Sequence, residues 1–278
     1  MEKKNIVMFP EVWDELTEAD WVAMLKLRER LLALPSDSEV SIDDIRREAA
    51  RSLLLNRGIR TRSSNDTYML LVYQCGLKLD WLWQTDDEGR VSLVYRSTVN
   101  LLPMFDALHG PMSHGADMVF GEFKDAIGMC RTYDATGDFD VLRTLAGMLY
   151  RKRRNSRTGK HRLPYDLDDE AEARGRRLPD WFVWGVYAWF SFFCEYLTTG
   201  IFIIDGEEVC FSKVFKGSGS QESGSSGTGL GLNAIALTLS ETGVFGDFED
   251  VLPTPLLRVM MKLLHDANSL EQIKKRKV

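Results

Sequence analysis

The sequence predicts a mainly α-helical protein with two small β-hairpins, built as a helical body and a flexibly tethered C-terminal helical module. Three observations predict this fold class. Apolar residues recur at helical spacing in several segments that begin at capping residues and end at proline or glycine. Alternating apolar and polar residues flank two short turns, as they do in β-hairpins. A Gly/Ser-rich run at 216–229 separates the last two helical segments from the rest of the chain.

The composition is that of a folded globular chain. The 278 residues include 35 Lys and Arg against 41 Asp and Glu, which gives a net charge of -6, and 44% of them are hydrophobic. A chain of this length can bury a core, and its composition excludes collagen-like and wholly disordered proteins. The mild acidity argues against a nucleic-acid surface over the whole chain but is compatible with a local basic patch.

The N-terminal part of the chain contains three predicted helices. The first is capped by Thr17 and runs to about Leu34, where Pro35 ends it. The second covers 41–56, with acidic residues in its first turn, where negative charge is favourable. The third covers 66–76. Together they predict a helical N-terminal body.

The two hairpins are expected near 79–95 and 201–211. In the first, two alternating runs enclose a turn of acidic residues and Gly89. In the second, the turn is Asp205-Gly206. Between the hairpins we expect a helical turn at 103–108, helices at 120–133 and 139–150, and an aromatic helix that begins at Trp181.

The aromatic helix is the most apolar part of the chain. Its uncharged run, 181–194, has about 14 residues, whereas a membrane-spanning helix needs about 20. We therefore expect a buried helix and no membrane contact. The N-terminal apolar patch is too short for a signal-peptide core, and no pair of the four cysteines has CxxC spacing. These features indicate reduced thiols and a cytoplasmic location.

The expected domains are a body at 1–215, a tether at 216–229 and a helical module at 230–278. The module holds helices at 230–242 and 255–267, joined by a connector at 243–250. We predict that its apolar side chains form a protein-binding face, and the alternative is that they pack back onto the body. The predicted face consists of Val244, Phe245, Phe248, Leu256, Leu257 and Met260.

A basic loop at 151–162 is the candidate site for phosphate or for an acidic protein surface. It has no acidic residue and no interleaved aromatic residue for base stacking, and an acidic stretch follows it. A solvated loop or a contact with an acidic partner is therefore favoured over nucleic acid. The predicted contact residues are Arg151, Lys152, Arg153, Arg154 and Arg157.

No motif indicates an enzyme, a cofactor or a metal site. The four histidines are scattered and lack partners at metal-ligand spacing. The string at 227–232 resembles the second glycine box of histidine-kinase ATP-binding domains, but the other boxes of that family are missing. Adjacent carboxylates, such as Asp86-Asp87, are typical of solvated turns. We predict a non-enzymatic protein.

Several strings resemble proteins encoded in phages and prophages of Bacteroides-type bacteria. They are Leu149-Tyr150-Arg151, the stretch from Tyr187 to Gly200 with the following hairpin, and, near the C-terminus, 243–246 and 254–257. The helical layout with a flexible joint is also similar to tail-assembly chaperones of long-tailed phages. At 278 residues the chain is long for such a chaperone.

This resemblance implies a morphogenesis factor that binds tape-measure or tail-tube proteins. A tape-measure helix exposes apolar stripes, which a groove between amphipathic helices could cover. The alternatives are a structural tail or neck protein of the virion, and a nucleic-acid-binding accessory protein that uses the basic loop.

Overall fold

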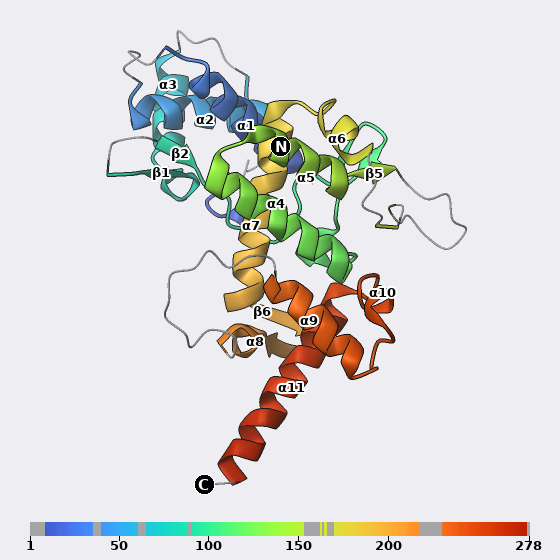
Figure 1. Ribbon diagram of the computed structural model, residues 1–278. Coiled ribbons are helices and arrows are strands. Elements are labelled where there is room, and N and C mark those ends of the chain that lie inside the picture. The colour runs from blue at the N-terminus through green and yellow to red at the C-terminus, as the bar shows by residue number, and fades with distance from the viewer. Residues whose placement is uncertain are drawn as a thin grey trace, which may run out of the picture. The chain divides into compact units, whose positions relative to one another are not determined.

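The computed structural model describes residues 9–35, 40–60, 65–87, 91–152, 162, 164–165, 170–216 and 230–276. The fold is mainly helical with a few small antiparallel sheets, which confirms the predicted fold class (Figure 1). Contacts divide the chain into two units. Unit 1 comprises Met1–Ser97 and Pro179–Ala188, and unit 2 comprises Thr98–Leu178 and Trp189–Val278. The predicted tether lies outside the described residues, except for Lys216.

Unit 1 contains the three predicted N-terminal helices. They are α1 (Glu18–Leu32), α2 (Ile42–Asn56) and α3 (Asp66–Gly76), preceded by the 3-10 helix η1 (Trp13–Glu15). Thr17 accepts a hydrogen bond from the backbone of Asp20, whose side chain accepts one from the backbone of Thr17. Such reciprocal capping satisfies backbone groups that the first turn leaves unpaired, and this explains where α1 begins.

The core of unit 1 combines aliphatic and aromatic side chains. Trp21, Leu53 and Val72 are completely buried. The ring of Trp21 lies 5.7 Å from that of Trp13 and 4.6 Å from that of Tyr95. Burial of these large side chains removes apolar area from water, which is the main favourable term in folding.

The hairpin expected near 79–95 is present but short. Strand β1 (Trp83–Thr85) pairs antiparallel with β2 (Val91–Leu93), and Asp80–Leu82 forms the 3-10 helix η2. The first part of helix α7 (Asp180–Thr199) also belongs to unit 1. There the guanidinium of Arg28 stacks 3.8 Å from the ring of Trp184, a cation–π contact.

Unit 2 is built around α4 (Phe120–Thr136), α5 (Phe139–Leu149) and α6 (Glu170–Gly175). Helices α5 and α6 cross very closely. A side chain at Gly147 would overlap the carbonyl group of Ala171 and lie 2.6 Å from the backbone nitrogen of Gly175. Helices α5 and α6 can therefore cross at this distance only because Gly147 has no side chain.

A small three-stranded sheet in unit 2 was not predicted. Strands β3 (Met104–Phe105), β4 (Leu108–His109) and β5 (Arg151–Lys152) pair antiparallel in that order. The expected helical turn at 103–108 is therefore wrong. Asp106 adopts a positive φ of 49°, which suits a tight turn between two strands.

The second hairpin is present as predicted. Strand β6 (Ile201–Ile204) pairs with β7 (Glu207–Cys210), and Gly206 at the turn has a φ of 84°. Before it, the second part of α7 buries Trp189, Phe190 and Phe193. None of the helices in the described ranges is long and apolar enough to cross a membrane.

The C-terminal segment forms α9 (Leu230–Glu241), α10 (Phe248–Val251) and α11 (Leu256–Arg276), after the short helix α8 (Ser212–Lys216). The two predicted helices are present, but α11 continues well beyond residue 267. The end of the predicted connector forms most of the helical turn α10, which is capped by Asp247.

Candidate binding groove

Backbone pairing holds the start of α11 against the start of α4. Val119 and Pro255 form an antiparallel bridge. The backbone of Phe120 donates to Thr254 O at 2.9 Å, and that of Leu256 donates to Met118 O at 2.9 Å. Proline suits this position because it has no N–H to donate. The bridge brings the first turns of α4 and α11 together.

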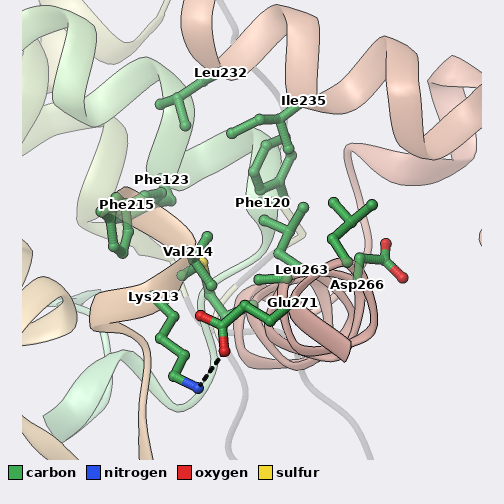
Figure 2. Close-up of a pocket in the computed structure, with 13 residues that line it drawn as sticks. Phe120, Phe123, Lys213, Val214, Phe215, Leu232, Ile235, Leu263, Asp266 and Glu271 are labelled. Carbon is green, nitrogen blue, oxygen red and sulfur yellow. Dashed lines mark hydrogen bonds and ion pairs between the residues drawn. The ribbon is translucent and has the colours of Figure 1, made fainter. Parts of the chain in front are cut away.

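A cavity of about 500 Å³ lies between four helices of unit 2. Figure 2 shows its aromatic and aliphatic side chains, which come from α4, α8, α9 and α11. We call this cavity the groove. Its apolar lining consists of Phe120, Phe123, Val214, Phe215, Leu232, Ile235, Met260, Leu263, Ala267 and Leu270.

The sequence of α11 explains which of its side chains reach the groove. Met260, Leu263, Ala267 and Leu270 are spaced alternately by three and four residues, so they follow one face of the helix. Leu256, one turn before Met260, is fully buried at the base of the helix. The apolar stripe thus passes from the core into the groove.

The stripe continues past the groove onto open helix surface. Leu270 is 59% exposed and Ile273, three residues later, is 51% exposed. From Leu263, the first partly exposed residue of the stripe, to Ile273 the axial rise is about 15 Å at about 1.5 Å per residue. The uncovered apolar surface is therefore elongated along α11.

Charged side chains lie only along the α8 and α11 sides of the lining. Lys213 Nζ is 3.2 Å from Glu271 Oε2 and 3.1 Å from Asn268 Oδ1. On α11, Lys262 Nζ is 2.5 Å from Asp266 Oδ2. The Lys213–Glu271 pair is half exposed and contributes at most about 1 kcal/mol. A ligand can therefore displace this pair at little cost.

The predicted contact face is not one exposed surface in the structure. Leu256 and Met260 are buried, because they form the packed side of α11. Val244 is 54% exposed in the loop before α10. The others, Phe245, Phe248 and Leu257, are half-buried. Of the six predicted residues, Met260 alone lines the groove.

Much of the groove was not predicted from the sequence. Phe120 and Phe123 belong to a helix more than a hundred residues away in the chain, and only the bridge to residue 255 brings them near. Leu232 and Ile235 follow the Gly/Ser-rich run. The one signal that could have indicated the site is the apolar stripe of α11, which continues beyond residue 267.

Arg151 does not belong to a solvated basic loop. Its side chain is buried, and Nη1 lies 2.8 Å from Glu122 Oε1 and donates to Met148 O at 2.7 Å. The carboxylate of Glu122 on α4 draws it inward, so it cannot contact a phosphate at the surface. Lys152 is exposed on β5. The remaining predicted contacts, Arg153, Arg154 and Arg157, lie outside the described residues.

A second arginine completes this buried ionic cluster. Arg162 Nη1 lies 2.7 Å from Glu122 Oε1, and Arg162 Nε lies 2.9 Å from Asp117 Oδ2. Burial opposes the charge of Arg162, but Glu122 and Asp117 outweigh it and raise its pKa. For Arg151, burial is the larger effect and lowers the pKa despite Glu122. The cluster holds two arginines and two carboxylates, so its net charge is zero.

The histidines do not form a metal site in the part of the chain that the structure describes. No group of three or more histidine, cysteine or acidic side chains there could hold an ion. His114 has a φ of 61°, and its Nδ1 lies 2.6 Å from Thr98 Oγ1. Thr98 O also accepts a hydrogen bond from Trp189 Nε1 at 3.2 Å. This contact ties the loop to α7.

No protein-family model, curated protein or solved structure matches the chain.

Proposed function

We propose that the protein is a non-enzymatic binding protein that holds an amphipathic helix of a partner protein in the groove. We further propose that it acts in phage tail assembly, as a chaperone of a tape-measure or tail-tube protein. The observation that carries the proposal is the elongated apolar surface along α11, which begins in a cavity of about 500 Å³ and ends on exposed Leu270 and Ile273.

The shape of this surface favours a helix as the ligand. A compact small molecule would fill the cavity but leave the stripe beyond it uncovered. A helix of about three turns, with apolar residues at i, i+3, i+4 and i+7, would match about 15 Å of surface. Helix-in-groove recognition of this kind needs no catalytic group.

The charges of the lining indicate the chemistry of that helix. Asp266 and Glu271 on α11 and Lys213 on α8 are its charged members, and each carboxylate already has a cation beside it, Lys262 for Asp266 and Lys213 for Glu271. The α9 side contributes the uncharged Leu232 and Ile235. We therefore expect no excess of either charge on the edge of the bound helix that faces α11, and small or apolar residues on the edge that faces α9.

The resemblance to tail-assembly chaperones supports the biological role. Such chaperones keep a tape-measure protein soluble by covering its apolar stripes. Two of the strings that carry the resemblance, 243–246 and 254–257, lie between the end of α9 and the first turn of α11, next to the groove in the chain. An apolar groove beside this segment is what a helix-covering protein requires.

The test is co-expression of the full chain with the tape-measure protein of a Bacteroides-type phage. We expect the chain to raise the soluble fraction of that protein and to co-purify with it. Ile235→Asp places a charge in the groove and should weaken the complex at least tenfold. Leu237→Asp is the matched control, since Leu237 is on the same helix but 53% exposed. Circular dichroism and thermal unfolding check that both variants fold.

Three outcomes contradict the proposal. If the tape-measure protein stays insoluble and the purified chain does not bind it, the chaperone role is rejected. If both variants bind like the unaltered chain, the groove is not the binding site. If purified virions contain the chain in stoichiometric amounts, it is a structural component.

A further inference from the structure

The β6–β7 hairpin has one packed face and one open face. Its register pairs Ile201 with Cys210 and Ile203 with Glu208, so these four side chains share a face. Phe202 points to the opposite face and is buried. On the shared face, Ile201 is 53% exposed and Ile203 is 68% exposed. The open face therefore presents two neighbouring isoleucines to solvent.

The turn of the hairpin determines which backbone groups of β6 point outward. Asp205 and Gly206 have φ angles of 53° and 84°, and two positive φ angles are typical of the type I′ turn of a two-residue hairpin. A hydrogen-bonded pair closes such a turn, and the pairs then alternate along an antiparallel ladder. The N–H and C=O groups of Ile203 and Ile201 therefore point away from β7, toward the outer edge of β6.

The two outer edges of the hairpin differ in chemistry. On β7 the outward residues are Glu208 and Cys210, and a charged residue on an edge hinders the addition of another strand. On β6 they are Ile201 and Ile203. The hydroxyl of Tyr196 donates to Ile201 O at 2.7 Å. The backbone N–H and C=O of Ile203 have no partner among the described residues. The edge of β6 is thus open and apolar.

Three carboxylates surround the turn end of this edge. Asp205, Glu207 and Glu208 are exposed, and none of them forms an ion pair with another described residue. Carboxylates without a cation, placed beside an apolar edge, favour a ligand that brings lysine or arginine. They repel the phosphates of a nucleic acid. The same strand of a second copy would bring only the same isoleucines and acids, so it lacks the complementary charge.

We propose that an extended basic segment of a partner protein adds to the outer edge of β6 as a third strand. Its apolar side chains would cover Ile201 and Ile203, and its lysine or arginine side chains would lie beside the acidic turn. Backbone hydrogen bonds to Ile203 would hold it, as in other cases of strand addition. None of these residues lines the groove, so the inference goes beyond the proposed function and does not depend on it.

Fluorescence anisotropy of the full chain with a labelled peptide tests the proposal. The probe is a peptide of about ten residues in which valine and lysine alternate. We expect a dissociation constant on the order of 10–100 µM. Amide hydrogen exchange locates the contact, because a third strand would pair the outward N–H groups of Ile201 and Ile203. We expect exchange at these two amides to slow at least tenfold when the peptide is saturating.

Two variants of the hairpin have matched controls elsewhere in the chain. Ile203→Lys should weaken peptide binding at least tenfold, and Glu208→Lys at least threefold, because each places a cation where the peptide brings its own. Leu237→Lys on α9 and Glu249→Lys on α10 make the same types of change at exposed positions away from the hairpin. Both controls should bind like the unaltered chain. Circular dichroism and thermal unfolding check that all four variants fold.

Several results would overturn the inference. If the peptide does not bind at about 1 mM, or if the controls lose as much affinity as the hairpin variants, the edge is not a basic-peptide site. If the peptide binds without slowing exchange at Ile203, it does not add as a strand. If the chain self-associates and Ile203→Lys abolishes this, the occupant is a second copy. Ile235→Asp should leave peptide affinity unchanged, which separates a failure here from a failure of the groove.

Discussion

Arg162 and Glu122 form a buried, two-point ion pair, with Nη1–Oε1 at 2.7 Å and Nη2–Oε2 at 3.3 Å. Arg151 shares Oε1 of the same carboxylate at 2.8 Å. One acidic side chain of α4 therefore neutralises two arginines, Arg151 next to α5 and Arg162 further along the chain. Removal of this carboxylate would leave both guanidinium groups buried with less compensation.

We predict that Glu122→Ala lowers the free energy of unfolding by about 3–5 kcal/mol, the usual cost of breaking a buried ion pair from one side. Urea unfolding followed by circular dichroism measures it. Glu172→Ala is the control, because Glu172 forms an exposed i,i+4 pair with Arg176. That change should cost well under about 1 kcal/mol. Equal losses of unfolding free energy in the two variants would show that the buried cluster contributes no more to stability than an exposed ion pair.

Local signals in the sequence predicted most of the helices. Thr17 and Ser41 cap α1 and α2 through reciprocal side-chain and backbone bonds, and the cap at Thr17 was expected from the sequence. Such bonds depend only on residues three apart, so they can be inferred without knowledge of the fold. The hairpin at Asp205-Gly206 was predictable for the same reason.

Long-range pairing could not be predicted in this way. Strand β5 forms only because Leu108 and His109 lie opposite Lys152 and Arg151, more than forty residues apart. The burial of Arg151 likewise depends on Glu122 from another helix. A run of basic residues gives no local sign that one member has a buried carboxylate partner. The groove was missed for the same physical reason.

The acid stability of unit 1 should depend on Asp20. This side chain is fully buried, and burial opposes its ionisation, but hydrogen bonds from Arg57 and Asn56 outweigh burial and lower its pKa below 3.8. Because the folded pKa is below the unfolded one, the stabilisation is complete above the unfolded pKa and is lost as the pH falls below about 4.

Asp20→Asn should therefore destabilise the protein at pH 7 and flatten the dependence of unfolding free energy on pH below about 5. Urea unfolding at a series of pH values measures both effects. Asp14→Asn, an exposed acid in η1, serves as control. The same acid dependence in the Asp20 variant and in the unaltered chain would refute the assignment.

The four cysteines should differ sharply in reactivity. Cys210 is exposed, whereas Cys75 and Cys130 are buried. Burial raises the pKa of Cys130 to about 12 and also raises that of Cys194. Because the thiolate is the reactive form, we expect one fast thiol of four with DTNB at pH 8 in the native protein. Cys210→Ser should abolish the fast phase, and a fast phase that persists would place the reactive thiol elsewhere.

Two helical glycines of unit 2 should respond oppositely to alanine. A methyl group at Gly147 would overlap Ala171 O across the α5–α6 crossing, where the obstacle is backbone and cannot move aside easily. A methyl group at Gly128 on α4 would meet nothing within 4 Å. Alanine is favoured over glycine inside a helix by about 0.5–1 kcal/mol, so Gly128→Ala should stabilise the protein by up to that amount.

Gly147→Ala should instead lower the unfolding free energy by several kcal/mol, because the helices must separate to admit the methyl group. Thermal unfolding of both variants measures the difference, and a Gly147→Ala variant as stable as the unaltered chain would mean that α5 and α6 do not cross this closely.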